Sequence, residues 1–322
     1  MKISEISFGA WAIGGPFAIA GRPIGWGAVD DALSLEALHR AFDLGINFVD
    51  TADMYGFGHS EEIVGKAIKE AGRKIFVATK VGFLREAVNG SIQDFGVDHI
   101  TRSCEESLRR LGQERIDLYQ LHCVPLSVIQ QGDAFLTLDK LQKQGKIRAY
   151  GVSIITDEEA VEAMKYPGVQ CVQIIFNCLR QKPAMTVFPM AKKKKVGILA
   201  RVPLASGLLS GKFNAQTTFA PQDHRSAPIP GETFSGLEFA QGLRCIEQLG
   251  PLAGQEKLTL TQLALRWILE SDAVTAAIPG ARNARQVEEN ASAHAVKISP
   301  DTMEKIQNMY IAELAELVES RY

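Results

Sequence analysis

The chain has 322 residues, of which 46% are hydrophobic, and its formal net charge is -2 at pH 7. This small negative net charge gives no indication of a basic surface that would bind nucleic acid or an anionic membrane. No run of about 18 apolar residues occurs, so a soluble cytoplasmic protein without a membrane segment is expected.

The cysteines and histidines give no sign of a disulfide-bonded protein or of a metalloprotein. The five cysteines are odd in number and form no C-x-x-C pair. In a chain of this size they are expected to be reduced thiols. The six histidines include no H-x-H or H-E-x-x-H pair, so no metal site is predicted.

Short apolar runs alternate with longer amphipathic segments along the chain, which predicts parallel strands joined by crossover helices. Strands are expected at residues 6–9, 47–50, 75–80, 118–122, 149–153, 171–176, 198–202 and 274–278. Helices are expected at residues 33–44, 61–71, 98–111, 135–144, 157–164, 186–194, 237–257 with 260–270, and 284–293. Eight such units close into a (β/α)8 TIM barrel, here one domain over residues 1–322. No G-x-G-x-x-G follows the first strand, as a doubly wound dinucleotide-binding sheet would usually show.

Three further segments complete this architecture. Residues 14–31 and 206–235 are rich in glycine, proline and aromatic side chains, and are predicted to be long active-site loops. An extra C-terminal helix is expected at residues 300–321, packed against the barrel by one apolar stripe. That stripe contains Met303, Ile306, Met309, Tyr310, Leu314 and Leu317.

Polar side chains stand where the predicted strands end. Asp50, Lys80 and His122 each close a strand, and Tyr55 follows Asp50 in a short connection. The carboxyl ends of barrel strands meet at one face, so these four groups are expected to converge. Individually, each has an ordinary structural reading: a turn cap for Asp50, a snorkelling side chain for Lys80, a rim aromatic for Tyr55 and a satisfied core histidine for His122.

Together these four side chains favour reduction of a carbonyl group. Tyr55 is a candidate general acid, although a free phenol with a pKa of about 10 is poorly matched to neutral pH. We expect the Lys80 ammonium to lower the pKa of Tyr55, and Asp50 to keep Lys80 charged and oriented. His122 is expected to give a second hydrogen bond to the carbonyl oxygen.

The segment that carries Asp50, Tyr55 and the following Gly58-His59-Ser60-Glu61 resembles the signature of the aldo-keto reductases. Similar matches occur at residues 78–80, 117–122, 145–148, 151–153 and 278–281. The resemblance implies a barrel that binds a nicotinamide cofactor without a Rossmann domain. It also implies that Asp50, Tyr55, Lys80 and His122 are the catalytic residues, with Tyr55 as proton donor.

The same resemblance implies a cofactor site built from several strand ends and loops. Its residues are Gly9, Ala10, Trp11, Ser153, Gln173, Arg201, Pro203, Leu204, Ser206, Gly207, Lys212, Arg225, Gly280, Arg282, Gln286, Glu289 and Asn290. Within this set Ser153 and Gln173 fall on positions for the nicotinamide carboxamide, and residues 203–212 resemble the segment that wraps the pyrophosphate. Arg282 is suited to a 2′-phosphate, which favours NADPH, with NADH as the alternative.

Three positions depart from the family pattern. Ile154 stands where many members have an asparagine that contacts the carboxamide, and Arg201 stands where many have an aromatic residue that stacks on the nicotinamide. The charge of Arg201 is expected to disfavour the positively charged oxidised ring. Gly280-Ala281 replaces a Lys-Ser pair of other branches, so the preference for NADP depends on Arg282.

The expected partner is a small carbonyl or alcohol substrate, with Trp11, Trp26 and Phe57 as an apolar or sugar-stacking wall. Neither the metabolite, nor the direction of the reaction in the cell, nor the oligomeric state follows from the sequence.

Two other functions use the same residues. One is a class I aldolase that forms a Schiff base at Lys80. The other is a cofactor-binding regulatory protein that resembles the β subunits of voltage-gated potassium channels.

Overall fold

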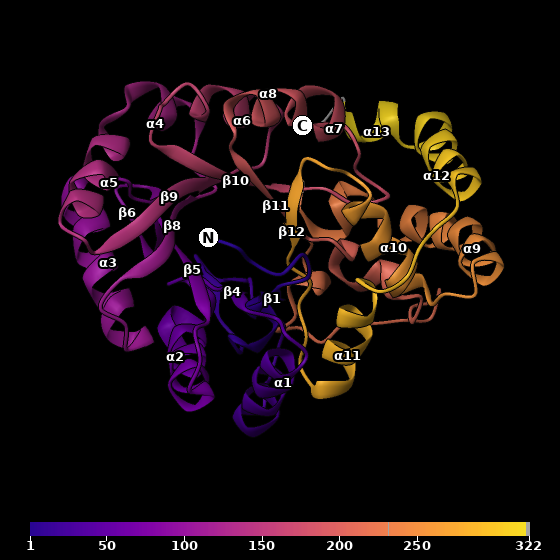
Figure 1. The fold of residues 1–322 in the computed structure, drawn as a ribbon, viewed down its shortest axis with the longest axis horizontal. Coiled ribbons are helices and arrows are strands. Elements are labelled where there is room, and N and C mark those ends of the chain that lie inside the picture. The colour runs from indigo at the N-terminus through magenta and orange to yellow at the C-terminus, as the bar shows by residue number, and fades with distance from the viewer. Residues whose placement is uncertain (231, 320–322) are drawn as a thin grey trace.

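The computed structural model describes residues 1–230 and 232–319, and its centre is an eight-stranded parallel sheet (Figure 1). The strands follow one another in chain order around the sheet. They are β1 (Phe8–Gly9), β4 (Phe48–Asp50), β5 (Phe76–Val81), β8 (Ile116–His122), β9 (Ile147–Ser153), β10 (Val169–Ile175), β11 (Gly197–Arg201) and β12 (Val274–Ala277). Parallel bridges from Ile6 to Ala277 and from Gly9 to Gly280 join the first segment to the last. The sheet is therefore a (β/α)8 barrel, as the sequence predicts, and each of the eight expected strands is found.

Helices cover the outside of the sheet, as Figure 1 shows. They are α1 (Asp31–Asp43), α2 (His59–Ala71), α3 (Val97–Leu111), α4 (Leu126–Gln131), α5 (Asp133–Lys143), α6 (Asp157–Ala163), α7 (Pro183–Thr186), α8 (Phe188–Lys194), α9 (Phe239–Gln255), α10 (Leu260–Leu269), α11 (Ala284–Ser292), α12 (Pro300–Glu313) and α13 (Ala315–Glu319). Several begin at a side chain that caps their free amides. Asp30 accepts from the amides of Ala32 and Leu33 at the start of α1, and Thr156 forms a capping box with Glu159 at the start of α6.

The barrel interior is built in layers, because alternate residues of a strand face the same side. The lower layer is apolar and contains Phe48, Ala78, Leu118, Ala149, Cys171, Leu199 and Ala276. Two positions further along the same strands lie Asp50, Lys80, Gln120, Gly151, Gln173, Arg201 and Ile278. A largely polar layer thus lies on an apolar floor near the carboxyl ends of the strands. This strand alternation, and not the loops alone, positions the site.

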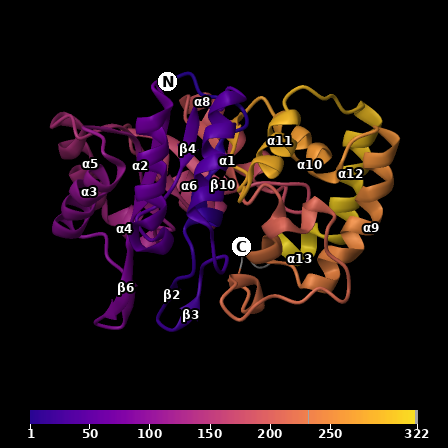
Figure 2. The ribbon, with the colours of Figure 1, turned by 90° about the horizontal axis from the view of Figure 1, so that it is seen from below.

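Two short antiparallel hairpins extend from the barrel, and Figure 2 shows both at the same end of the molecule. One, within the expected loop 14–31, pairs β2 (Ala18–Ile19) with β3 (Arg22–Pro23). The other pairs β6 (Phe83–Val88) with β7 (Ser91–Gln93) and was not predicted. Its turn is Asn89-Gly90, with φ of 51° and 79°, and an Asn-Gly pair is a strong hairpin signal.

The C-terminal helix differs from the expected one. It divides into α12 and α13 at Leu314, where φ is -121°. Ile306, Met309, Tyr310 and Leu314 of the predicted stripe are buried, but Leu317 is 40% exposed, and Val318 is the buried residue of α13 instead. Residues 320 and 321 of the predicted helix lie outside the described residues. In the part of the chain that is described, no helix combines the length and the apolar character needed to cross a membrane.

All five cysteines, Cys104, Cys123, Cys171, Cys178 and Cys245, are free and buried. Burial raises the pKa of Cys104 and Cys123 to about 12 and that of Cys245 to about 11. The thiolate is the reactive form. We therefore expect the native protein to react slowly with a thiol-specific disulfide reagent at mildly alkaline pH, and denatured protein to release five equivalents at once. A fast single equivalent from native protein would contradict this expectation.

Candidate active site

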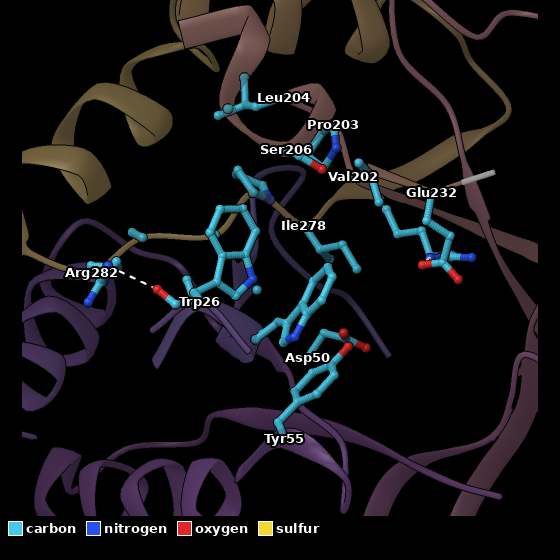
Figure 3. A pocket seen from close by; sticks show the side chains of 18 of the residues that line it. Trp26, Asp50, Tyr55, Val202, Pro203, Leu204, Ser206, Glu232, Ile278 and Arg282 are labelled. Carbon is cyan, nitrogen blue, oxygen red and sulfur yellow. Dashed lines mark hydrogen bonds and ion pairs between the residues drawn. The ribbon is translucent and has the colours of Figure 1, made fainter. Parts of the chain in front are cut away.

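A cavity of about 780 Å³ opens at the carboxyl ends of the strands and continues to the start of α11 (Figure 3). Most of the predicted site residues line it: Gly9, Trp11, Trp26, Asp50, Tyr55, His122, Gln173, Arg201, Pro203, Leu204, Ser206, Gly207, Lys212, Arg225, Gly280, Arg282, Gln286, Glu289 and Asn290. Ala10, Lys80 and Ser153 are fully buried behind the wall. Phe57 lies apart from the cavity, packed edge-on against Phe17 with the guanidinium of Arg85 over its ring.

Lys80 is the centre of the four predicted catalytic residues. Its ammonium lies 2.6 Å from Asp50 Oδ2 and 2.8 Å from the carbonyl oxygen of Thr51, and donates to the hydroxyl of Tyr55 at 3.3 Å. All three donor positions of the ammonium are therefore engaged. The ring of Trp11 stacks on that of Tyr55, with 6.0 Å between the ring centroids.

Two glutamines support Asp50 across the barrel interior, Gln120 from β8 and Gln173 from β10. Gln173 donates to Asp50 Oδ1 at 2.8 Å, and Gln120 reaches the same oxygen at 3.3 Å. Ser153 in turn donates to Gln173 Oε1 at 3.5 Å. The predicted carboxamide pair, Ser153 and Gln173, is thus part of the network that orients Asp50. Gln120 was not predicted, although its place two residues before His122 puts it on the same inward face of β8.

The pKa of Tyr55 is raised well above its ordinary value, by burial first and by the charge of Asp50 second. The sequence argument expected the opposite direction, because it considered Lys80 and not the removal of the phenol from water. Burial also lowers the pKa of Lys80, against the opposing effect of Asp50. Tyr55 therefore remains a protonated phenol over the neutral range, which is the form that can donate a proton.

His122 closes the site beside Tyr55 and Phe83, with ring centroids 5.9 and 5.1 Å away. Burial, together with the positive charges of Lys80 and Arg201, lowers its pKa well below the usual range. The imidazole is consequently neutral and carries one N–H donor. Such a ring can donate to a carbonyl oxygen without adding a positive charge.

Arg201 ends β11 and pairs with a residue that the sequence analysis missed. Its NH1 lies 2.8 Å from Glu232 Oε2, and its NH2 donates to the carbonyl oxygen of Ile154 at 3.1 Å. Burial lowers the pKa of Arg201, but the carboxylate of Glu232, together with Cys123 and Tyr55, raises it overall above its ordinary value. The positive charge expected beside the nicotinamide position is therefore neutralised by Glu232. Nothing in the local sequence marks Glu232, because it lies in the long loop far from any strand.

Cations gather at the opposite end of the cavity. The pKa of Lys212 is lowered by burial and by the nearby charges of Arg225 and Arg282. Arg225 is held by Asp223 and lies 4.7 Å over the ring of Trp26. Such crowding of like charges is favourable when an anion lies between them, which fits the phosphates of a nicotinamide dinucleotide.

The residues predicted to hold the adenosine form a turn before α11 that is fixed by hydrogen bonds. Gln286 accepts from the amide of Arg282 at 2.8 Å, and Asn290 donates to the carbonyl oxygen of Gly280 at 3.3 Å. The guanidinium of Arg282 donates to the carbonyl oxygens of Trp26 and Ala28. Asn283 and Arg285 also line this end, beside the predicted residues.

The two long loops meet over the cavity. The amide of His224 donates to the carbonyl oxygen of Gly25 at 2.9 Å, and Trp26 forms an antiparallel bridge with Asp223. The ring of His224 lies 4.6 Å from each of Trp11 and Trp26, and burial lowers its pKa to about 4. The rings of Trp11, Trp26 and the neutral His224 therefore form one aromatic cluster over the cavity, continuous with the wall that Trp11 and Trp26 were predicted to form.

The geometry agrees with comparisons to known proteins. A model of the aldo/keto reductase family matches residues 5–311. Aldo-keto reductase YhdN of Bacillus subtilis is 35% identical over 291 residues, which cover 89% of this chain and 84% of the relative. The NADH-specific methylglyoxal reductase of Escherichia coli is 28% identical over 312 residues, with 93% and 92% covered. The structure of the glycerol dehydrogenase AKR11B4 from Gluconobacter oxydans superimposes with a TM-score of 0.79 at 32% identity, and 97% of this chain and 93% of that one are covered.

Proposed function

Because the chain belongs to the aldo/keto reductase family, whose members are nicotinamide-dependent oxidoreductases, we propose that it reduces an aldehyde or ketone to an alcohol with NADPH. The observation that supports this most directly is the buried contact of Lys80 with Asp50 and Tyr55, at 2.6 and 3.3 Å. This contact holds a protonated phenol in the wall of the cavity. Cationic side chains line the other end of the same cavity.

Each of the four proposed catalytic residues has a separate role in the reduction. The nicotinamide supplies the hydride when it is bound. Tyr55 donates its proton to the carbonyl oxygen, and the Lys80 ammonium stabilises the phenolate that Tyr55 leaves behind. The neutral His122 ring donates a hydrogen bond to the same oxygen and orients the carbonyl group. Asp50, held by Gln120 and Gln173, keeps Lys80 charged in spite of its burial.

The first test is loss of the near-ultraviolet absorbance of NADPH, and separately of NADH, with a panel of small aldehydes and ketones. We expect turnover with NADPH and weaker turnover with NADH. If the protein binds either coenzyme tightly but turns over no carbonyl, a regulatory protein similar to potassium-channel β subunits becomes the better reading.

The preference for NADPH is assigned to Arg282. We expect Arg282→Ala to raise the dissociation constant of NADPH about 10- to 100-fold, the scale of hydrogen bonds to a charged group. NADH lacks the 2′-phosphate, so a change in its dissociation constant measures only the effect of losing the contacts of Arg282 with Trp26 and Ala28. Fluorescence titration gives the dissociation constants of both coenzymes in the wild type and the variant. Equal weakening for the two coenzymes would mean that Arg282 only braces the loop.

The aldolase reading is disfavoured by the position of Lys80. Its side chain is fully buried and lies outside the lining of the cavity, with its ammonium engaged by three oxygens. A lysine that forms a Schiff base needs access to the carbonyl carbon and a free amine. Absence of any substrate adduct on Lys80 after borohydride treatment is the expected result.

A further inference from the structure

The two residues expected to hold the nicotinamide carboxamide are engaged by Asp50 and by each other. The side-chain amide of Gln173 donates to Asp50 at 2.8 Å, and its Oε1 accepts from Ser153 at 3.5 Å. Ser153 is itself fully buried, and the next residue, Ile154, has no polar side-chain atom. A nicotinamide bound in the cavity therefore needs other partners for the carboxamide that it carries.

Arg201 and Glu232 form a polar corner of the cavity wall beside Ile154. Arg201 NH1 lies 2.8 Å from Glu232 Oε2, and Arg201 NH2 donates to the carbonyl oxygen of Ile154 at 3.1 Å. The corner is thus next to the position at which the asparagine contact is missing. Figure 3 shows Glu232 and Arg282 on opposite sides of the cavity, so the corner is separate from the cations at the far end.

Hydrogen bonding in this corner is incomplete. Arg201 is only 8% exposed, and no residue of the described chain accepts a hydrogen bond from its Nε. A buried N–H without a partner is unfavourable and calls for an acceptor. Within the described residues, the donor that reaches Glu232 Oε1 is the thiol of Cys123 at 3.7 Å, and a thiol is a weak donor. The corner therefore offers one unused donor and one under-used acceptor.

The charges of the corner restrict which group can use both. Glu232 would repel a carboxylate or a phosphate, and Arg201 would repel an amine. A primary carboxamide is neutral, with a carbonyl oxygen that accepts and an NH2 group that donates. It can accept from Arg201 Nε and donate to Glu232 Oε1 at the same time, so it satisfies both atoms.

The corner also lies at the end of the cavity where the nicotinamide ring is needed. Cys123, which contacts Glu232, directly follows His122 in the chain, and the rings of His122 and Tyr55 are 5.9 Å apart. When the phosphates of an extended dinucleotide occupy the cationic end, its nicotinamide reaches this opposite end. The carboxamide is the one substituent of that ring that forms hydrogen bonds.

We propose that Arg201 and Glu232 bind the carboxamide of the nicotinamide, with Arg201 Nε donating to its oxygen and Glu232 Oε1 accepting from its NH2 group. This inference rests on the proposed use of NADPH. It gives the long loop that carries Glu232 a direct role in coenzyme binding and compensates for Ile154. Glu232 at the same time holds Arg201 and neutralises its charge beside the ring.

The test compares NADPH with its reduced 3-acetylpyridine analogue, in which a methyl group replaces the NH2 of the carboxamide. Isothermal titration calorimetry gives both Kd values for the wild type and for Glu232→Gln. In the wild type we expect the analogue to bind about 10- to 100-fold more weakly than NADPH, the scale of a hydrogen bond to a charged group. In Glu232→Gln the amide oxygen keeps the contact with Arg201 and an NH2 group replaces the acceptor, so the two Kd values should become similar. Glu247→Gln, which removes an exposed carboxylate of α9, should leave the ratio as in the wild type.

The outcomes separate this inference from the function on which it rests. If the wild type binds neither NADPH nor NADH, the proposed function fails. If NADPH binds and the ratio of the two Kd values is the same in the wild type and in Glu232→Gln, only the carboxamide site is overturned, because loss of a purely structural contact weakens both coenzymes alike. If Glu232→Gln does not fold, the wild type decides alone: equal Kd values for NADPH and the analogue overturn the carboxamide site, and weaker binding of the analogue supports it.

Discussion

Replacing Tyr55 with phenylalanine is expected to lower kcat for carbonyl reduction about 100- to 10,000-fold, the range for loss of a positioned general acid. The Tyr55 hydroxyl is the group that accepts from Lys80 at 3.3 Å, and burial keeps it protonated. Phenylalanine keeps the ring, so the stacking on Trp11 should persist. Steady-state kinetics with NADPH and a reactive aldehyde measure the loss, and fluorescence titration reports whether NADPH still binds.

Tyr166→Phe is the matched control for Tyr55→Phe. The Tyr166 hydroxyl donates to the carbonyl oxygen of Ile129 at 2.6 Å, on the outside of the barrel. Its loss removes one hydrogen bond and no group of the site. If Tyr55→Phe and Tyr166→Phe retain similar kcat values, Tyr55 is not the proton donor.

Lys80→Met is expected to lower the free energy of unfolding by about 3–5 kcal/mol, because it leaves a buried carboxylate without its cation. Asp50 and Lys80 are 2% and 0% exposed, and their charged atoms are 2.6 Å apart. Urea unfolding at neutral pH, followed by tryptophan fluorescence, measures the change. The double variant Asp50→Asn with Lys80→Met should regain part of this loss, since no isolated charge then remains.

The control is a lysine with an exposed charge. Lys74 lies 3.5 Å from Asp117, and its side chain is 57% exposed; Asp117 is itself buried but keeps a second cation, Arg148, at 3.1 Å. Lys74→Met should therefore change the free energy of unfolding by only about 0–1 kcal/mol. A loss of similar size in Lys80→Met and Lys74→Met would show that burial of the Asp50–Lys80 pair is not what makes it important.

Much of the fold was predictable because strand alternation and helix periodicity are local properties of the chain. The apolar runs located all eight barrel strands, and their last polar residues brought Asp50, Lys80 and His122 together as expected. Gln120 was accessible to the same reasoning, because it shares the inward face of β8 with His122. The hairpin at Asn89-Gly90 was also readable from its turn residues.

Other features depend on tertiary packing and have no local signal. Glu232 lies 31 residues from Arg201 in the sequence, and its role depends on how the long loop folds back over the barrel. The direction of the pKa shift of Tyr55 depends on burial, which a list of neighbouring charges does not contain. The break at Leu314 separates two segments that share one apolar periodicity in the sequence.

Closure of the barrel between Ile6 and Ala277 has a consequence for biosynthesis. During translation the first strand leaves the ribosome long before its final neighbour exists, and pairing of such distant segments is slow. Gly9 and Gly280, which meet at this seam, both line the cavity. A nascent chain that ends before residue 277 thus lacks one wall of the cavity, so a ligand bound there could stabilise the fold only after nearly the whole polypeptide has been made.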